Sequence, residues 1–168
     1  MFLDETSTNT KLTKRTGWSP RGERYCTYAP FGAWRTQTFV AALRYNGLTA
    51  PWLVDAPMNR ETFEVYVETQ LAPTLRPREV VILDNVAFHK GPTVEALIRA
   101  RGAWLLFLPP YSPDLNPIEM AFSKLKSQLR KHAARTFDDV FRALGEICDL
   151  FSTTECRNYF KAVGIEAH

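Results

Sequence analysis

A chain of 168 residues is long enough to bury one well-formed hydrophobic core, so we expect a single domain. Its hydrophobic fraction of 45% and charged fraction of 23% are ordinary for a soluble globular protein, and its net charge of +3 is too small to predict nucleic-acid binding by itself. The three cysteines lack Cys-x-x-Cys spacing, which argues against a disulfide framework or a zinc site, and no apolar run reaches the roughly 18–20 residues of a membrane span. These features, with no visible signal peptide, are typical of a protein of the reducing cytoplasm.

The first predicted element is a strand that leads into two acids. Phe2 and Leu3 come directly before Asp4 and Glu5. Because successive residues of a strand face opposite sides of the sheet, we expect that these two acids do not both point into one site.

A basic stretch follows, from Lys11 to Arg24. It holds one acid, Glu23, one tryptophan, Trp18, and the cations Lys11, Lys14, Arg15, Arg21 and Arg24. Two interpretations are open at this point. The stretch is either a solvated hairpin or a basic loop whose cations and aromatic ring contact a DNA backbone.

The next segments are predicted to be strands and then a helix. Residues 36–45 are rich in residues that favour strands, Asn46-Gly47 is a hairpin signal, and residues 48–54 form the returning strand. We expect residues 24–28 to pair on the other side. A helix opening at residues 59–62 ends before Pro73, with one apolar face made by Phe63, Tyr66, Val67 and Leu71.

A strand–helix–strand unit occupies the middle of the chain. Residues 80–83 form a continuous apolar run that ends in Asp84, and residues 104–108 form a second run, stopped by Pro109-Pro110. Both runs predict buried strands. Between them Gly91-Pro92 opens a helical pattern that Gly102 closes. Polar residues therefore gather at the strand ends, which is the edge of an open sheet where sites are built.

Three helices complete the predicted order. The first starts at Asn116-Pro117 and has a core face of Ile118, Phe122, Leu125 and Leu129. Its opposite side is basic, with Lys124, Lys126, Arg130, Lys131 and Arg135. Two further helices start near Thr136 and Thr153.

Two motifs resemble the catalytic core of Tc/mariner-type transposases, and within them the bacterial insertion-sequence six-thirty group. They are Leu-Asp-Asn-x-x-x-His at 83–89 and Leu-Pro-Pro-Tyr-Ser-Pro-Asp-Leu-Asn-Pro-Ile-Glu at 108–119. The resemblance implies a DDE-type endonuclease with a ribonuclease-H-like α/β fold, a mixed five-stranded sheet flanked by helices. It also implies a catalytic triad of Asp4, Asp84 and Glu119, with the family's spacing of 34 residues between the second and third acids. From the resemblance we also expect residues 1–168 to be a single catalytic domain, without the family's N-terminal helix-turn-helix region.

The three acids make chemical sense as a metal platform. Two divalent ions about 4 Å apart activate the attacking water and neutralise the charge that develops during phosphodiester cleavage. Hard ions such as Mg²⁺ prefer oxygen ligands, and without metal three convergent acids would repel one another. We therefore expect Asp4, Asp84 and Glu119 to bind two Mg²⁺ ions, with Mn²⁺ able to substitute. Which aspartate bridges the ions stays open.

Each acid also has a structural interpretation. Asp84 could cap a strand or a turn with Asn85, and Asp4 lies so close to the start of the chain that disorder is the alternative for it. Glu119 could complete a capping box with Asn116 at the N-cap and Pro117 at the first helical position. Asp114 is the rival third acid, although it fits better as a turn residue after Ser112-Pro113.

Other residues are candidates for supporting roles. Asn85 is interpreted as a residue that holds a carboxylate in place. His89 is a candidate for the same supporting role or for a hydrogen bond to a phosphate or a metal-bound water, and the simpler interpretation is a loop histidine with satisfied hydrogen bonds. Lys14, Arg15, Lys126 and Arg130 are the candidate DNA contacts, and Lys126 and Arg130 share a helix face with Glu119.

The sequence thus predicts a transposase catalytic domain that performs metal-dependent DNA strand cleavage and strand transfer in cut-and-paste transposition. The alternative is an inactive fragment that binds DNA or dimerises as a regulator. The expected partners are transposon-end and target DNA and a second copy of the chain in a homodimer, with an upstream-encoded DNA-binding half as a further candidate. The expected location is the bacterial cytoplasm, associated with the nucleoid.

Overall fold

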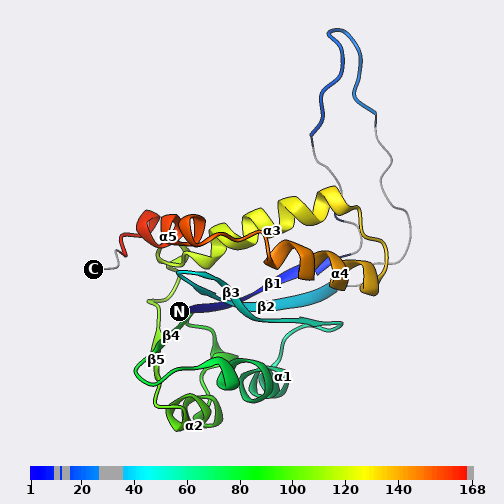
Figure 1. Ribbon diagram of the computed structural model, residues 1–168. Helices are drawn as coiled ribbons and strands as arrows, with labels where there is room; N and C mark the ends of the chain where they lie inside the picture. Colours follow the sequence, from blue (N-terminus) through cyan, green and yellow to red (C-terminus); the bar gives the residue numbers. More distant parts are fainter. Residues whose placement is uncertain (10–11, 13–15, 27–35, 166–168) are drawn as a thin grey trace.

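The computed structural model describes residues 1–9, 12, 16–26 and 36–165, and it is built around a five-stranded sheet (Figure 1). The strands are β1 (Phe2–Asn9), β2 (Thr36–Arg44), β3 (Gly47–Val54), β4 (Val80–Leu83) and β5 (Trp104–Phe107). The helices are α1 (Arg60–Tyr66), α2 (Pro92–Ala100), α3 (Ile118–His132), α4 (Phe137–Cys148) and α5 (Thr153–Ala162). Short helical turns lie at Val67–Leu71 (η1), Ala72–Thr74 (η2), Ala87–His89 (η3) and Pro113–Leu115 (η4).

The sheet is mixed, with the strand order β3-β2-β1-β4-β5. β2 pairs antiparallel with β1 and β3, whereas β1, β4 and β5 run parallel to one another. β1 therefore lies at the centre, with an antiparallel neighbour on one side and a parallel neighbour on the other. The prediction of a mixed five-stranded sheet flanked by helices is confirmed.

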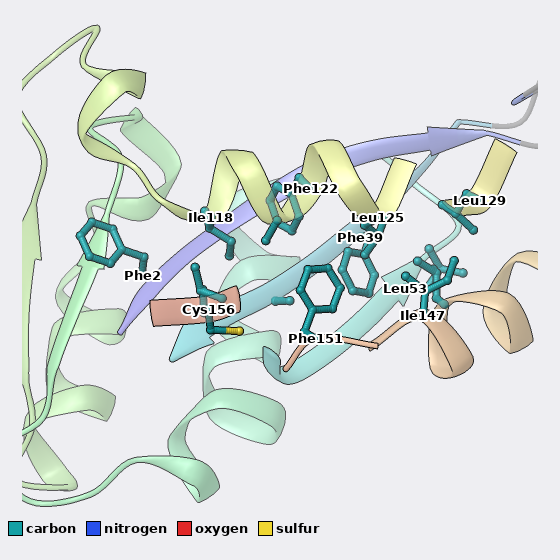
Figure 2. Close-up of a cluster of buried hydrophobic side chains, with 14 of the residues drawn as sticks. Phe2, Phe39, Leu53, Ile118, Phe122, Leu125, Leu129, Ile147, Phe151 and Cys156 are labelled. Atoms are coloured by element: carbon teal, nitrogen blue, oxygen red, sulfur yellow. The ribbon is translucent and has the colours of Figure 1, made fainter. Parts of the chain in front are cut away.

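Helices cover the two faces of the sheet as separate layers (Figure 1). On one face, α3, α4 and α5 enclose a core in which the rings of Phe39 and Phe122 meet edge to face at 6.1 Å between centroids (Figure 2). On the other face, α1, η1 and α2 bury Leu3 of β1 and Val81 of β4 with Phe63 and Tyr66. Alternating residues of β1 thus face different layers, as the period of a strand requires.

Local signals explain several element boundaries. Asn59 caps α1 by accepting a hydrogen bond from the backbone N–H of Thr62 at 2.9 Å. Gly102 ends the α2 segment with φ +71°, a conformation that glycine adopts without steric cost. Thr136 and Asp139 form a capping box that starts α4.

Two sequence predictions about strands are corrected. Residues 24–26, the described part of the predicted 24–28 strand, are not in a strand; β1 occupies the place beside β2, in register from Phe2–Leu43 to Asn9–Thr36. The run at 104–108 is not a buried strand. β5 is the edge strand, with Trp104 66% and Leu106 53% exposed, because only its other face packs against the α2 layer.

In the described residues 16–26, which include most of the basic stretch, the chain extends away from the sheet and turns at Pro20–Glu23 (Figure 1). The turn is closed by a 3.0 Å hydrogen bond from the Glu23 N–H to the Pro20 carbonyl, and Trp18 is 99% exposed. Contact of this segment with DNA stays a prediction. Separately, none of the helices in the described ranges is long and apolar enough to cross a membrane.

Candidate active site

Three different elements bring the predicted acids to one cleft. Leu3 of β1 is in parallel register with Leu83 of β4, so the next residues, Asp4 and Asp84, emerge side by side at the same edge of the sheet. Glu119 lies in the first turn of α3, which packs across β1. The cleft has a volume of ≈ 510 Å³, and all three carboxylates line it.

The remaining walls of the cleft come from two loops. Asn85 and Val86 follow β4, and residues 108–113 follow β5. Tyr111 stands fully exposed at the rim with φ +56°, a left-handed conformation that is uncommon for a residue with a side chain. Carboxylate and amide groups thus line the cleft together with this loop, whose Tyr111 projects into solvent.

Asp4 is the buried member of the three acids. Its side chain accepts hydrogen bonds from the Glu5 backbone N–H at 2.8 Å and from Asn116 Nδ2 at 2.9 Å. Burial raises the pKa of Asp4 to about 8, with further contributions from the charge of Glu5 and the smaller effects of Asp84 and Glu119. A cation in the cleft would offset this repulsion between like charges.

The contact with Asn116 corrects the predicted capping box. α3 begins at Ile118, its N-cap is Pro117, and no side chain caps it. The side chain of Asn116 donates to Asp4 instead, while its backbone carbonyl accepts from the Glu119 N–H at 3.3 Å. Glu119 is therefore free of the capping role, and its exposed side chain faces solvent and the cleft.

Asp84 contacts a histidine that lies beneath the cleft. His89 Nδ1 is 2.6 Å from Asp84 Oδ1, a close ion-pair contact rather than an aligned hydrogen bond, and His89 Nε2 is 3.0 Å from Glu5 Oε2. Burial alone lowers the pKa of His89, but the contacts with Asp84 and Glu5 outweigh it and raise the pKa to about 9. His89 has no exposed surface, so the alternative of direct contact with a substrate phosphate is not what this structure shows.

Glu5 and Asn116 are the site residues that the sequence interpretation missed. Glu5 also lines the cleft, although β1 directs it to the face opposite Asp4, so the expectation that only one of the two acids belongs to the site is corrected. Its connection runs through His89, 84 positions away in the chain. No local pattern signals such a contact. Asn116 was noticed in the sequence, but as a partner of the helix that carries Glu119 and not as a partner of Asp4.

Comparison with known proteins decides the family. A family model described as DDE superfamily endonuclease matches residues 1–141. The chain belongs to this family. The prediction of a DDE-type endonuclease is confirmed, and the assignment to the insertion-sequence six-thirty group stays a prediction.

Solved structures agree with the DDE endonuclease fold. The strand transfer complex of Mos1 is similar to this chain with a TM-score of 0.68 and 16% identity, over 96% of this chain and 52% of the Mos1 chain. The Mos1 mariner paired end complex with Mn is similar with a TM-score of 0.67 and 17% identity, over 96% of this chain and 50% of the Mos1 chain. The catalytic domain of Mos1 mariner transposase is similar with a TM-score of 0.66 and 15% identity, over 96% of this chain and 74% of that domain. This chain therefore spans about half the length of the transposases in the two complexes. No curated protein matches it significantly.

Of the predicted DNA contacts and the rival third acid, those that the structure describes do not line the cleft. Lys126 and Arg130 are on α3 but do not line it, and the Nε of Arg130 is buried without a hydrogen-bond partner. Lys14 and Arg15 lie outside the described residues. Asp114 is exposed in η4 and does not line the cleft, which agrees with its interpretation as a turn residue.

The donors at the cleft suit a hard divalent cation. They are carboxylate and amide oxygens, and the Oδ1 atoms of Asn85 and Asn116 are buried without hydrogen-bond partners. Within the described ranges, no three His, Cys, Asp or Glu side chains converge closely enough to enclose one ion. Magnesium keeps several waters and is commonly held by one or two carboxylates, so a magnesium site does not require three side chains that enclose one ion.

The raised pKa of Asp4 predicts a pH dependence of folding without metal. An ordinary aspartate has a pKa of 3.8, so between about pH 4 and pH 8 the folded protein binds one proton more than the unfolded chain. The free energy of unfolding should therefore fall as pH rises, by at most roughly 1.4 kcal/mol per pH unit from this group. Thermal melts of the metal-free protein between pH 5 and pH 8 should show a decreasing melting temperature.

The matched variant for this prediction is Asp4→Asn. It keeps the shape of the side chain and removes the charge, so its melting temperature should fall less steeply with pH and exceed that of the parent at pH 8. A parental slope in the variant would show that Asp4 is not the group responsible. Because His89, with its raised pKa, also favours folding below its folded-state pKa of about 9, a residual slope of the same sign is expected in the variant.

Proposed function

We propose that this domain performs metal-dependent DNA strand cleavage and strand transfer in cut-and-paste transposition. The observation that carries the proposal is the convergence of Asp4, Asp84 and Glu119, from three separate elements, on a single cleft in a chain of the DDE endonuclease family. The proposed cofactor is Mg²⁺, replaceable by Mn²⁺, with two ions for each site. Its proposed ligands are the three carboxylates.

The chain's own groups have distinct parts in this chemistry. A bound divalent ion would activate the attacking water and neutralise charge on the scissile phosphate. Asn116 and the Glu5 N–H orient the carboxylate of Asp4, and both hydrogen bonds favour its charged form. The exposed Glu119 enters from α3, and the loop of residues 108–113 bounds the side by which a DNA strand would reach the carboxylates.

The proposed partners are transposon-end and target DNA, and the proposed assembly is a homodimer on DNA. The structures similar to this one include Mos1 in paired end and strand transfer complexes. An upstream-encoded DNA-binding half is proposed to supply sequence recognition, because Lys126 and Arg130 are side chains suited to phosphate contacts rather than to reading bases.

The direct test of this function is cleavage of an oligonucleotide carrying the transposon end by the full-length protein. We expect cleavage with Mg²⁺ or Mn²⁺ and none with excess EDTA. Strand transfer should follow when a target duplex is added. DNA binding without any cleavage under both metals would contradict the proposal and leave a binding role.

We also predict that the isolated chain binds duplex DNA weakly and without sequence preference. Each phosphate contact releases counterions, so binding should weaken steeply between about 50 and 200 mM salt. In the double variant Lys126→Gln, Arg130→Gln, the slope of log affinity against log salt concentration should become shallower by about two units. Arg99→Gln, on the exposed side of α2, is the control and should keep the slope. Nanomolar preference for one terminal repeat at physiological salt would contradict this prediction.

A further inference from the structure

The two aspartates of the cleft are supported in different ways. Asp4 lies within β1, which is paired on both sides, and two hydrogen bonds hold its carboxylate. Asp84 comes after the last residue of β4, with a side chain that is 36% exposed. Among the described residues, the side chain in contact with the Asp84 carboxylate is His89. The position of Asp84 in the cleft therefore depends on what fixes this histidine.

The ring of His89 is fixed by packing on its faces and by carboxylates at both nitrogens. It is fully buried, with the rings of Phe63 and Phe88 each 4.4 Å away between centroids. Nδ1 faces Asp84 at 2.6 Å and Nε2 faces Glu5 at 3.0 Å. A rotated ring would lose both contacts inside an aromatic pocket, where an unpaired polar atom is costly.

Glu5 supplies the fixed end of this arrangement. It belongs to the central strand, where its backbone is paired with Val40 of β2, and its side chain is only 17% exposed. Strand alternation sends Asp4 to the α3 face and Glu5 to the α1 face. β1 thus places Asp4 directly in the cleft. From the opposite face of β1, Glu5 contacts His89, and His89 in turn contacts Asp84.

We propose that Glu5 and His89 form a positioning pair that holds the carboxylate of Asp84 at the cleft, so that β1 sets the location of both aspartates. This inference rests on the proposed function, in which Asp84 binds a divalent ion. Partners of a metal-binding carboxylate commonly change metal affinity by about 10- to 100-fold when they are removed. His89 is fully buried and is expected to act in this way without touching metal or DNA, whereas Glu5 lines the cleft and is proposed to act on Asp84 through His89.

The test is the affinity of the full-length protein for Mn²⁺ in the absence of DNA, measured by electron paramagnetic resonance of free Mn²⁺. Glu5→Gln should weaken Mn²⁺ binding by about 10-fold or more, because a neutral amide fixes the His89 ring less firmly. His89→Leu should weaken it at least as much. Glu155→Gln is the matched control, since Glu155 also accepts from two side chains, Lys124 and Tyr159, but lies on α5 outside the cleft. It should bind Mn²⁺ like the parent.

A double-mutant cycle separates positioning from general loss of structure. If Glu5 acts through Asp84, Glu5→Gln should have little further effect on Mn²⁺ affinity in an Asp84→Asn background. Equal effects in both backgrounds, or parental affinity in Glu5→Gln with the fold retained, would overturn the inference. If Asp84→Asn itself leaves Mn²⁺ binding unchanged, the proposed function fails first. Melting temperatures without metal identify any variant that has lost its fold, and Glu5→Gln then decides in place of His89→Leu.

Discussion

Replacing Asp84 by alanine is expected to reduce metal-dependent cleavage of transposon-end DNA by at least about 10³-fold, the scale seen when a member of a catalytic set is removed. The proposed chemistry needs oxygen ligands in the cleft, and alanine provides none. The fold should survive, because Asp84 follows the end of β4 and its side chain is 36% exposed. A cleavage assay beside a thermal melt measures both effects.

The control for this prediction is Asp114→Ala. Asp114 is an exposed acid of η4 that does not line the cleft, so its loss should leave cleavage close to the parental rate. Cleavage by Asp84→Ala at a near-parental rate would remove Asp84 from the catalytic set. Loss of cleavage in Asp114→Ala together with full activity in Glu119→Gln would move the third acid to Asp114.

Glu119→Gln is expected to abolish cleavage with almost no change in stability. Glutamine is a neutral and much poorer ligand for a hard cation than glutamate. The side chain of Glu119 is exposed and does not cap α3, so the substitution removes no hydrogen bond that the structure shows within the helix. An early melt with retained cleavage would show that Glu119 is structural only.

Asn116→Ala is the companion variant, and the structure predicts a different effect for it than the capping interpretation does. As a helix cap, Asn116 would contribute about 1 kcal/mol to stability and nothing to the metal site. It donates instead to the carboxylate of Asp4, so its loss should reduce cleavage and metal affinity. Asn116→Asp, which replaces the donor by a like charge, should be more damaging than Asn116→Ala.

The parts of the fold that could be predicted from the sequence are those set by local signals. The apolar run before Asp84, the hairpin signal at Asn46-Gly47 and the core face of α3 each depend on residues close in the chain. Asp4 and Asp84 are far apart in the chain, and the periodicity of the sequence does not predict that they meet. That prediction came from the motifs that resemble the transposase family. Parallel pairing of β1 with β4 then explains why the two acids meet.

The errors have a common physical origin, which is competition between local and distant partners. Asn116 has the residue type and spacing of a helix cap, but the buried carboxylate of Asp4 takes its N–H group. Trp104 and Leu106 are apolar like the core residues of β4, but only the opposite face of β5 packs against a helix layer, so both are exposed. Strand alternation placed Glu5 on the face opposite Asp4, but it did not predict that Glu5 also lines the cleft and contacts His89.

The central claim is that Asp4, Asp84 and Glu119 together bind the divalent ions of a DNA-cleaving site. Anomalous diffraction from crystals of this domain soaked in Mn²⁺ tests that claim most directly, because it locates the ions independently of activity. We predict anomalous peaks in the cleft, within coordination distance of the Asp4, Asp84 and Glu119 carboxylates, and no such peaks in crystals of Asp84→Ala. Mn²⁺ bound elsewhere on the domain, with the cleft free of anomalous signal at saturating Mn²⁺, would contradict it.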